Sequence, residues 1–207
     1  MVLRTLCPSH PDFGADLDII EYVRERPVFG HTSEAEISSV RDLTMMRHAL
    51  AAAREARDQG EIPVGAVVVV GDRILSVARS EREATRDPTA HAEILALRRA
   101  ASALDTWRLT GCTLYSTLEP CPMCAGAAHA AQISRLVFAT PSPKSGYAGT
   151  LHNIPADASL NHTFPVTSGV LETEAADLLR EFFRQKRHNA PHEPSETPQA
   201  STPEASI

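Results

Sequence analysis

The chain has 207 residues, of which 43% are hydrophobic, and its formal net charge is −6. This size suits one folded domain with flanking segments, and the acidic balance argues against generic nucleic-acid binding, although a local basic patch is compatible with it. The sequence has no apolar run long enough to cross a bilayer and no signal-peptide pattern at its start, so we expect a cytoplasmic protein with no membrane segment.

Composition divides the chain into three segments. Residues 1–41 carry four basic and seven acidic residues and form an N-terminal extension of unknown role. Residues 42–189 hold sixteen basic and sixteen acidic residues, and their apolar patterning predicts the folded domain. Residues 190–207 are rich in Pro, Ser, Thr and Glu, which predicts a disordered tail.

The first half of the predicted domain reads as a helix followed by a hairpin. Apolar residues recur at helical spacing over 42–59, which predicts an amphipathic helix. The β-branched run 64–70 and the segment 74–78 flank Gly71 and Asp72, a pair typical of a two-residue hairpin turn. We therefore expect two antiparallel strands here.

The second half alternates helices and strands. Asp87 and Pro88 predict an N-cap and a first-turn proline for a helix that ends near Leu104. The remaining predicted elements are, in chain order, a strand over 113–117, an alanine-rich helix from about Cys121, a strand over 136–140 and a helix over 172–187. This order predicts an α/β fold with a mixed sheet and helices on both faces.

Three potential metal ligands lie at the expected starts of two helices. His91 belongs to the first of these helices, and Cys121 and Cys124 are three positions apart at the start of the next, so that both sulfurs can face one point. Catalytic zinc characteristically has three protein ligands and a fourth position for water. Glu93 follows His91 by two positions, where a carboxylate can take a proton from the water and return it to a leaving amine. The sequence predicts a Zn²⁺ site with Glu93 as the general acid and base.

Each of these motifs alone has a plainer explanation. A histidine on an alanine-rich helix is commonly an ordinary residue, and a Cys-x-x-Cys pair can be a redox centre or half of a structural zinc site that Cys112 completes. A non-catalytic RNA-binding or partner subunit that keeps zinc for stability is a further alternative. Glu93 argues against it, because only catalysis needs a carboxylate there. In combination, His-x-Glu followed by Pro-Cys-x-x-Cys is the signature of zinc deaminases.

Residues 43–187 resemble the bacterial tRNA-specific adenosine deaminases of the cytidine-deaminase-like superfamily. The resemblance rests on the stretches IPVGAVVV, RDPTAHAEILALRRA, GCTLYSTLEPCPMCAGA, YAGTL, LNH and GVLETEAADLLREFFRQKR. It implies a three-layer α/β/α fold with a five-stranded mixed sheet and usually a homodimer. It also implies that His91, Cys121 and Cys124 hold zinc and that the wobble adenosine of a tRNA anticodon is converted to inosine.

Two positions depart from the pattern of that family. The residue eleven positions before the zinc histidine is an asparagine that contacts the target base in the family and is Ser80 here, which offers only one short hydroxyl. Ser142 replaces an aspartate that many relatives carry, in a loop that we expect to border the substrate entrance together with Lys144. Ser80, Ser142 and Lys144 are thus the predicted substrate-binding residues. Deamination of a free base or nucleoside of the guanine, adenine or cytosine type remains an alternative to tRNA.

Basic residues gather near the end of the last predicted helix. A phosphate-binding patch is predicted from Arg180, Arg184, Lys186 and Arg187 together with Lys144. The alternative is a solvated helical face, because cations near a helix C-terminus are also favoured by the dipole. Of the adjacent Phe182 and Phe183, which can stack on a base, we expect at least one in the core.

Overall fold

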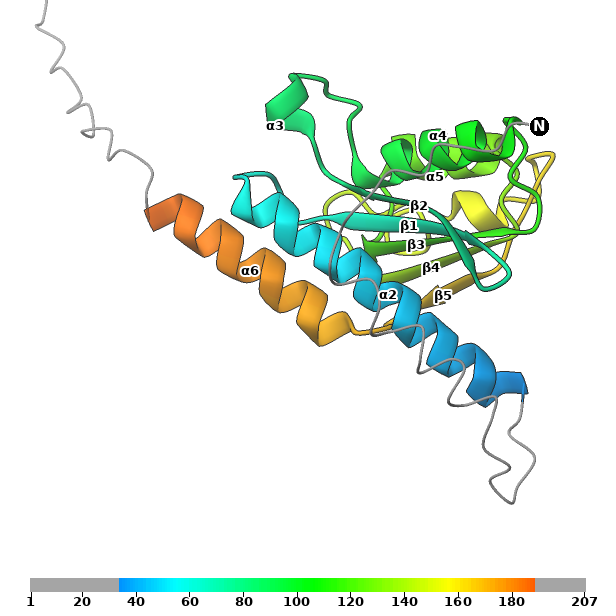
Figure 1. Cartoon of the computed structure of the whole chain (residues 1–207), viewed down its shortest axis with the longest axis horizontal. Coiled ribbons are helices and arrows are strands. Elements are labelled where there is room, and N and C mark those ends of the chain that lie inside the picture. Colours follow the sequence, from blue (N-terminus) through cyan, green and yellow to red (C-terminus); the bar gives the residue numbers. More distant parts are fainter. Residues whose placement is uncertain (1–33, 189–207) are drawn as a thin grey trace, which may run out of the picture.

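Five strands form one mixed sheet in the computed structural model, which describes residues 34–188 (Figure 1). They are β1 (Gly65–Val70), β2 (Arg73–Arg79), β3 (Cys112–Leu118), β4 (Arg135–Thr140) and β5 (Val166–Ser168), and their order across the sheet is β2-β1-β3-β4-β5. β1 is antiparallel to both of its neighbours, whereas β3, β4 and β5 are mutually parallel. The predicted five-stranded mixed sheet is confirmed.

Helices cover both faces of this sheet (Figure 1). α4 (Ala92–Leu104) and α5 (Pro122–Ala130) lie on one face, and α2 (Glu34–Asp58) and α6 (Glu172–His188) lie on the other. Successive side chains of a strand point to opposite faces, so Val68 and Leu114 pack in the cluster under α4 and α5, whereas Val67 packs against α2. The result is the expected three-layer α/β/α arrangement.

A glycine and a buried polar cluster fix α2 on its face of the sheet. A Cβ atom at Gly65 would lie 2.0 Å from the backbone oxygen of Ala49, so only glycine allows α2 to approach β1 this closely. The Tyr115 hydroxyl donates a hydrogen bond of 2.7 Å to Asp42, and the Arg135 guanidinium binds both oxygens of that carboxylate at 2.8 and 2.6 Å. These contacts join α2 to β3 and β4.

Several boundaries differ from those predicted. α2 begins at Glu34 and not at residue 42. The helix expected from Pro88 begins at Ala92, because the Asp87 carboxylate accepts the Thr89 N–H at 2.7 Å and closes a turn before the helix. Three short elements were not predicted: α3 (Arg82–Thr85), the 3-10 helix η1 (Ile154–Ala156) and β5.

The expected segment limits fall partly beyond the structure. Residues 1–33 and 189–207 lie outside the described range, so the extension, the disordered tail and the domain limits stay predictions. Within residues 34–188, no helix combines the length and the apolarity needed to cross a membrane.

The direction of the strands places three carboxyl ends at the same edge of the sheet. β2, β3 and β4 run the same way, because β1 is antiparallel to both β2 and β3. Their carboxyl ends therefore meet at one edge of the sheet, the usual position of a ligand site in α/β folds. Ser80, Glu119 and Ser142 follow these ends within two residues.

Candidate active site

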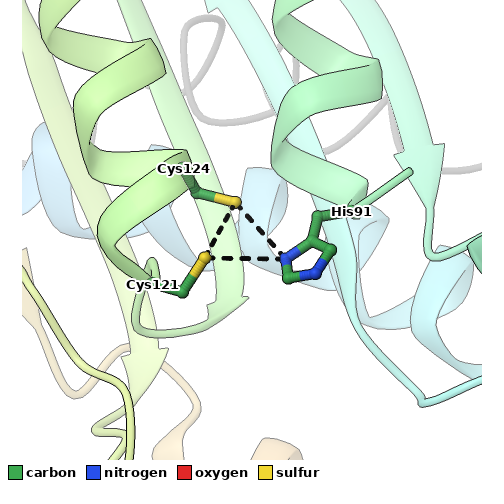
Figure 2. Close-up of side chains that lie close together, drawn as sticks. All are labelled: His91, Cys121 and Cys124. Carbon is green, nitrogen blue, oxygen red and sulfur yellow. Dashed lines mark hydrogen bonds between the residues drawn. The ribbon is translucent and has the colours of Figure 1, made fainter. Parts of the chain in front are cut away.

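The three predicted metal ligands converge at this edge (Figure 2). The Nδ1 atom of His91 lies 3.7 Å from the sulfur of Cys121 and 3.5 Å from that of Cys124, and the two sulfurs are 3.6 Å apart. Cys124 is buried, whereas His91 and Cys121 are partly accessible. A histidine and a pair of cysteines at least thirty positions away in sequence thus form one compact donor set.

The three ligands lie at the N-terminal ends of α4 and α5. His91 is the N-cap of α4 and Cys121 the N-cap of α5, and neither side chain caps its own helix. Pro122 at the first turn of α5 favours the helix start, and Cys124 follows in the same turn. Because the positive ends of two helix dipoles point to this place, thiolates are favoured here.

The spacing of the donor atoms fits a tetrahedral zinc site. At usual Zn–S and Zn–N bond lengths, tetrahedral angles place ligand atoms about 3.6 to 3.8 Å apart. The observed separations of 3.5 to 3.7 Å agree with this geometry. One imidazole nitrogen and two sulfurs make a zinc-type donor set that leaves a fourth position for water or substrate.

The donor atoms also modify one another electrostatically. The hydrogen bond between the two cysteine sulfurs lowers the pKa of Cys121 to about 4, and His91 contributes in the same direction. The same contact raises the pKa of Cys124, with burial adding to the effect. The contact with Cys121 raises the pKa of His91. The site therefore favours a thiolate at Cys121 before any cation binds.

Glu93 lies beside this donor set. It sits in the first turn of α4, and only 3% of its surface is exposed. Burial raises the pKa of its carboxyl to about 7. Glu93, His91 and Cys121 line the same cleft, and the Glu93 carboxyl interacts with the Cys124 side chain, so the carboxyl lies next to the donor set.

That cleft has a volume of about 990 Å³. The three predicted substrate-binding residues, Ser80, Ser142 and Lys144, all line it. Ser80 is buried, and its hydroxyl lies 3.4 Å from the carboxylate of Glu61. Every residue of the predicted site therefore lines one cleft except Cys124, whose sulfur lies beneath it, 3.6 Å from that of Cys121.

α6 forms a basic wall of the cleft. Arg180, Arg184 and Arg187 line it together with Phe183, whose side chain is 41% exposed. Arg180 and Arg184 also pair with acidic residues one turn earlier in the helix, Asp177 and Glu181 respectively.

One member of the predicted patch lies outside the cleft lining. Lys186 does not line the cleft, and its ammonium group lies 5.6 Å from the ring centre of Phe182. Phe182 is buried, as expected for one of the two phenylalanines. On α6, three of the four basic residues of the predicted patch thus line the cleft, and the phosphate-binding role of the patch stays a prediction.

Comparisons with known proteins agree with this geometry. Residues 39–140 match the cytidine and deoxycytidylate deaminase zinc-binding region. The tRNA-specific adenosine deaminase of Bacillus subtilis is 45% identical over 146 residues, a match that covers 70% of this chain and 91% of that relative. The chain belongs to the cytidine and deoxycytidylate deaminase family.

Solved structures of similar proteins match the fold of this deaminase. A tRNA:A34 deaminase that edits A to I at the wobble position is 39% identical, with a TM-score of 0.63 over 65% of this chain and 98% of that one. The guanine deaminase of Nitrosomonas europaea is 28% identical, with a TM-score of 0.61 over 68% of this chain and 83% of that one. The deaminase thus shares its fold with proteins that act on different substrates.

Two buried glutamates of this deaminase were missed by the sequence analysis. Glu61 accepts the backbone N–H of Ala84 at 2.8 Å and thereby anchors the segment that follows Ser80. Glu119 accepts hydrogen bonds from the backbone N–H groups of Ser142, Ala148 and Thr150 and from the Thr150 hydroxyl. In the sequence, each glutamate is marked only by its position directly before a motif: Glu61 precedes IPVGAVVV and Glu119 precedes PCPMC.

The hydrogen bonds also set the ionisation of Glu119. Burial by itself would raise the pKa of its carboxyl, but the donors from Ser142, Thr150 and Ala148 outweigh burial and hold the pKa below the usual value. Glu119 is therefore a buried carboxylate that is fully satisfied by hydrogen bonds.

Proposed function

We propose that this protein is a zinc-dependent deaminase that converts the wobble adenosine of a tRNA anticodon to inosine, with release of ammonia. The observation that carries the proposal is the combination of a zinc-type donor set and Glu93 inside a cleft with a basic wall. The similarity to tRNA-specific adenosine deaminases supports the choice of substrate.

The charge of the cleft favours RNA over a free base, and its size admits either. Its volume of about 990 Å³ is at the upper end of the range for small-ligand sites, roughly 300–1,000 Å³. Arg82, Lys144 and Arg187 line the cleft, and the described residues give none of the three an ion-pair partner. Exposed cations around a reactive centre are what a sugar-phosphate backbone needs. The exposed ring of Phe183 supplies a surface on which a neighbouring base can stack.

In the proposed mechanism, His91, Cys121 and Cys124 hold the zinc ion and Glu93 moves the protons. Zinc in such a site acts as a Lewis acid that makes water a nucleophile near neutral pH. Glu93 takes a proton from the attacking water and delivers it to the amine that leaves C6 of adenine, so that water supplies the new oxygen. Burial of Glu93 excludes bulk water from this transfer.

Ser80 supports one alternative, the deamination of a free base or nucleoside. The serine hydroxyl reaches less far into the cleft than the asparagine that the resemblance leads us to expect, which leaves room for a differently placed ring. The likeness to the guanine deaminase, at 28% identity, is weaker than that to the wobble deaminase, at 39%. We therefore keep this alternative second.

A substrate panel separates the two functions. Ammonia release by the zinc-loaded protein is measured with an anticodon stem-loop that carries a wobble adenosine, and with guanine, adenine, cytosine and their nucleosides. Turnover of the stem-loop alone supports the proposal. Turnover of a free base or nucleoside without turnover of RNA would replace it with the alternative.

We further propose that the protein acts in the cytoplasm as a homodimer. The support for dimerisation is the resemblance to the tRNA deaminases, and the support for the compartment is the location of tRNA. Analytical ultracentrifugation of the full chain tests the assembly, since a single monomeric species at working concentration contradicts it.

A further inference from the structure

The loop that borders the cleft after β4 is attached to the segment that carries the cysteines. Residues 141–150 form this rim loop, and residues 119–124, the metal turn, lead from β3 into α5. Ser142 and Lys144 of the rim loop line the cleft. The position of these two side chains therefore depends on how the rim loop is held.

One buried carboxylate makes most of the attachment. The Oε2 atom of Glu119 accepts the N–H of Ser142 at 2.9 Å and also the hydroxyl of Thr150. Its Oε1 atom accepts the N–H groups of Ala148 and Thr150, each at 3.0 Å. Each oxygen thus binds two donors, and both ends of the rim loop converge on one side chain.

The backbone of the loop is shaped around this carboxylate. A Cβ atom at Gly146 would lie 2.1 Å from an oxygen of Glu119, so residue 146 has to be glycine for the carboxylate to occupy its place. The backbone N–H of Tyr147 also donates to the carbonyl of Pro120 at 2.9 Å, directly before the first cysteine of the metal turn. The loop and the metal turn therefore form one connected unit.

We propose that Glu119 is a positioning residue that latches the rim loop to the metal turn and so holds Ser142 and Lys144 at the cleft. Glu119 neither binds zinc nor transfers protons in this scheme. The substrate arm of the test rests on the proposed function, whereas the latch itself is tested without any substrate.

Limited proteolysis of the full-length, zinc-loaded protein tests the latch. Trypsin should cleave after Lys144 faster when the loop detaches, because a protease requires an extended backbone, and the fragment that ends at Lys144 is followed by mass spectrometry. In Glu119→Gln, an amide nitrogen replaces one of two oxygens that each accept two hydrogen bonds, so we expect cleavage about tenfold faster than in the unchanged protein. Equal rates in the two proteins would overturn the proposal.

A second pair of variants keeps the test valid if Glu119→Gln fails to fold. Thr150 is exposed, and its hydroxyl is one of the donors to Glu119. Thr150→Val removes this donor and should accelerate cleavage about threefold, whereas Thr150→Ser keeps it and should restore protection. Identical behaviour of the valine and serine variants would contradict the latch.

A matched control removes a buried hydrogen bond on the other face of the sheet. Tyr115→Phe removes the hydrogen bond to Asp42 but leaves the rim loop untouched. It should lower the melting temperature without faster cleavage after Lys144. Accelerated cleavage in this control would mean that general destabilisation, and not the latch, opens the loop.

Steady-state kinetics on the anticodon stem-loop complete the test. Loss of the latch should raise KM about tenfold and change kcat by less than about twofold, with zinc content unchanged, because the loop serves binding and not the chemical step. A fall in kcat together with a loss of zinc would instead make Glu119 a support of the cysteines and overturn the proposal. If the unchanged protein does not turn over the stem-loop, the proposed function fails while the proteolysis result still decides on the latch.

Discussion

Glu93 is the residue on which the proposed chemistry depends most directly. It is buried at the cleft beside His91, Cys121 and Cys124, and it is not one of the three candidate metal ligands. We expect Glu93→Gln to lower kcat by about 10²- to 10⁴-fold, because the amide cannot carry a proton between water and amine. Ammonia release measures the loss, and metal analysis should find the same zinc content as before. Undiminished deamination in this variant would refute the mechanism.

The side chain at position 80 should influence substrate preference. Ser80 is buried at the cleft, where an asparagine would reach further toward a bound base. Ser80→Asn should raise kcat/KM for the anticodon stem-loop about tenfold, since one good base contact is worth roughly 1–3 kcal/mol. Ser80→Ala is the companion variant, and it should not show this gain. An unchanged or lower kcat/KM in Ser80→Asn would count against a pocket adapted to RNA.

At the scale of single elements, the side of α6 that lines the cleft should bind the phosphates of an RNA stem-loop. Arg187 and Lys144 line the cleft from a helix and a loop. Replacing either by alanine should weaken binding of a stem-loop and reduce the slope of log K against log salt by about 0.7 to 0.9 for each phosphate that the variant no longer binds. Fluorescence anisotropy over a salt series measures the slope.

Arg108 provides the matched control for this charge removal. It is exposed, and its guanidinium lies 4.7 Å from the ring centre of Trp107, outside the cleft lining. Arg108→Ala should leave the slope unchanged. Equal effects of Arg108→Ala and Arg187→Ala would show that general charge, and not the α6 wall, attracts the RNA.

The contact between α2 and β3 predicts a dependence of stability on pH. Burial, the hydrogen bond with Asp42 and the charge of that carboxylate raise the pKa of Tyr115 above its usual value. A raised pKa in the folded state means that the contribution is complete below the unfolded pKa of about 10 and is lost as the pH rises above it.

Tyr115→Phe measures this contribution. The variant should lose about 1 to 2 kcal/mol of unfolding free energy near neutral pH, because one buried hydrogen bond to a charged group disappears. The difference from the unchanged protein should shrink above about pH 10, where the unfolded tyrosine ionises. Urea unfolding at several pH values measures both quantities, and a constant difference would contradict the pKa argument.

Which elements were predictable depends on whether local pattern or tertiary contact defines them. The hairpin followed from the β-branched run of β1 and the turn pair Gly71 and Asp72, and β3 and β4 followed from short runs typical of buried strands. β5 has three residues and pairs only with β4, so no local pattern marks it. The start of α4 was misplaced because Asp87 and Pro88 have the composition of a helix start but form a separate turn.

At the scale of the whole molecule, the predicted zinc ion links two helices across the sheet edge. Because it binds only the folded donor set, removing it should lower the melting temperature as well as abolish deamination. Dialysis against a chelator followed by calorimetry tests this, and added zinc should restore both properties. Full activity after complete metal removal would contradict the proposed zinc chemistry.

The candidate site was predictable from sequence where its chemistry needs fixed residue types. His91, Glu93, Cys121 and Cys124 could be proposed from the sequence because zinc and proton transfer demand these side chains at these spacings, and the structure places the three metal ligands together. Glu61 and Glu119 were not found, because their partners are mainly backbone N–H groups, which any residue can supply. Such anchors become visible only when the path of the chain is known.

The common direction of β2, β3 and β4 also has an evolutionary consequence. Each of these strands ends at the same edge and passes into a separate segment, so residues around the substrate can change in the segments after β2 and β4 while the sheet and the three zinc-binding residues remain. Ser80 and Ser142, the two departures from the tRNA deaminase pattern, both lie just beyond such strand ends. Laboratory selection for new substrates should therefore concentrate its mutations in these segments.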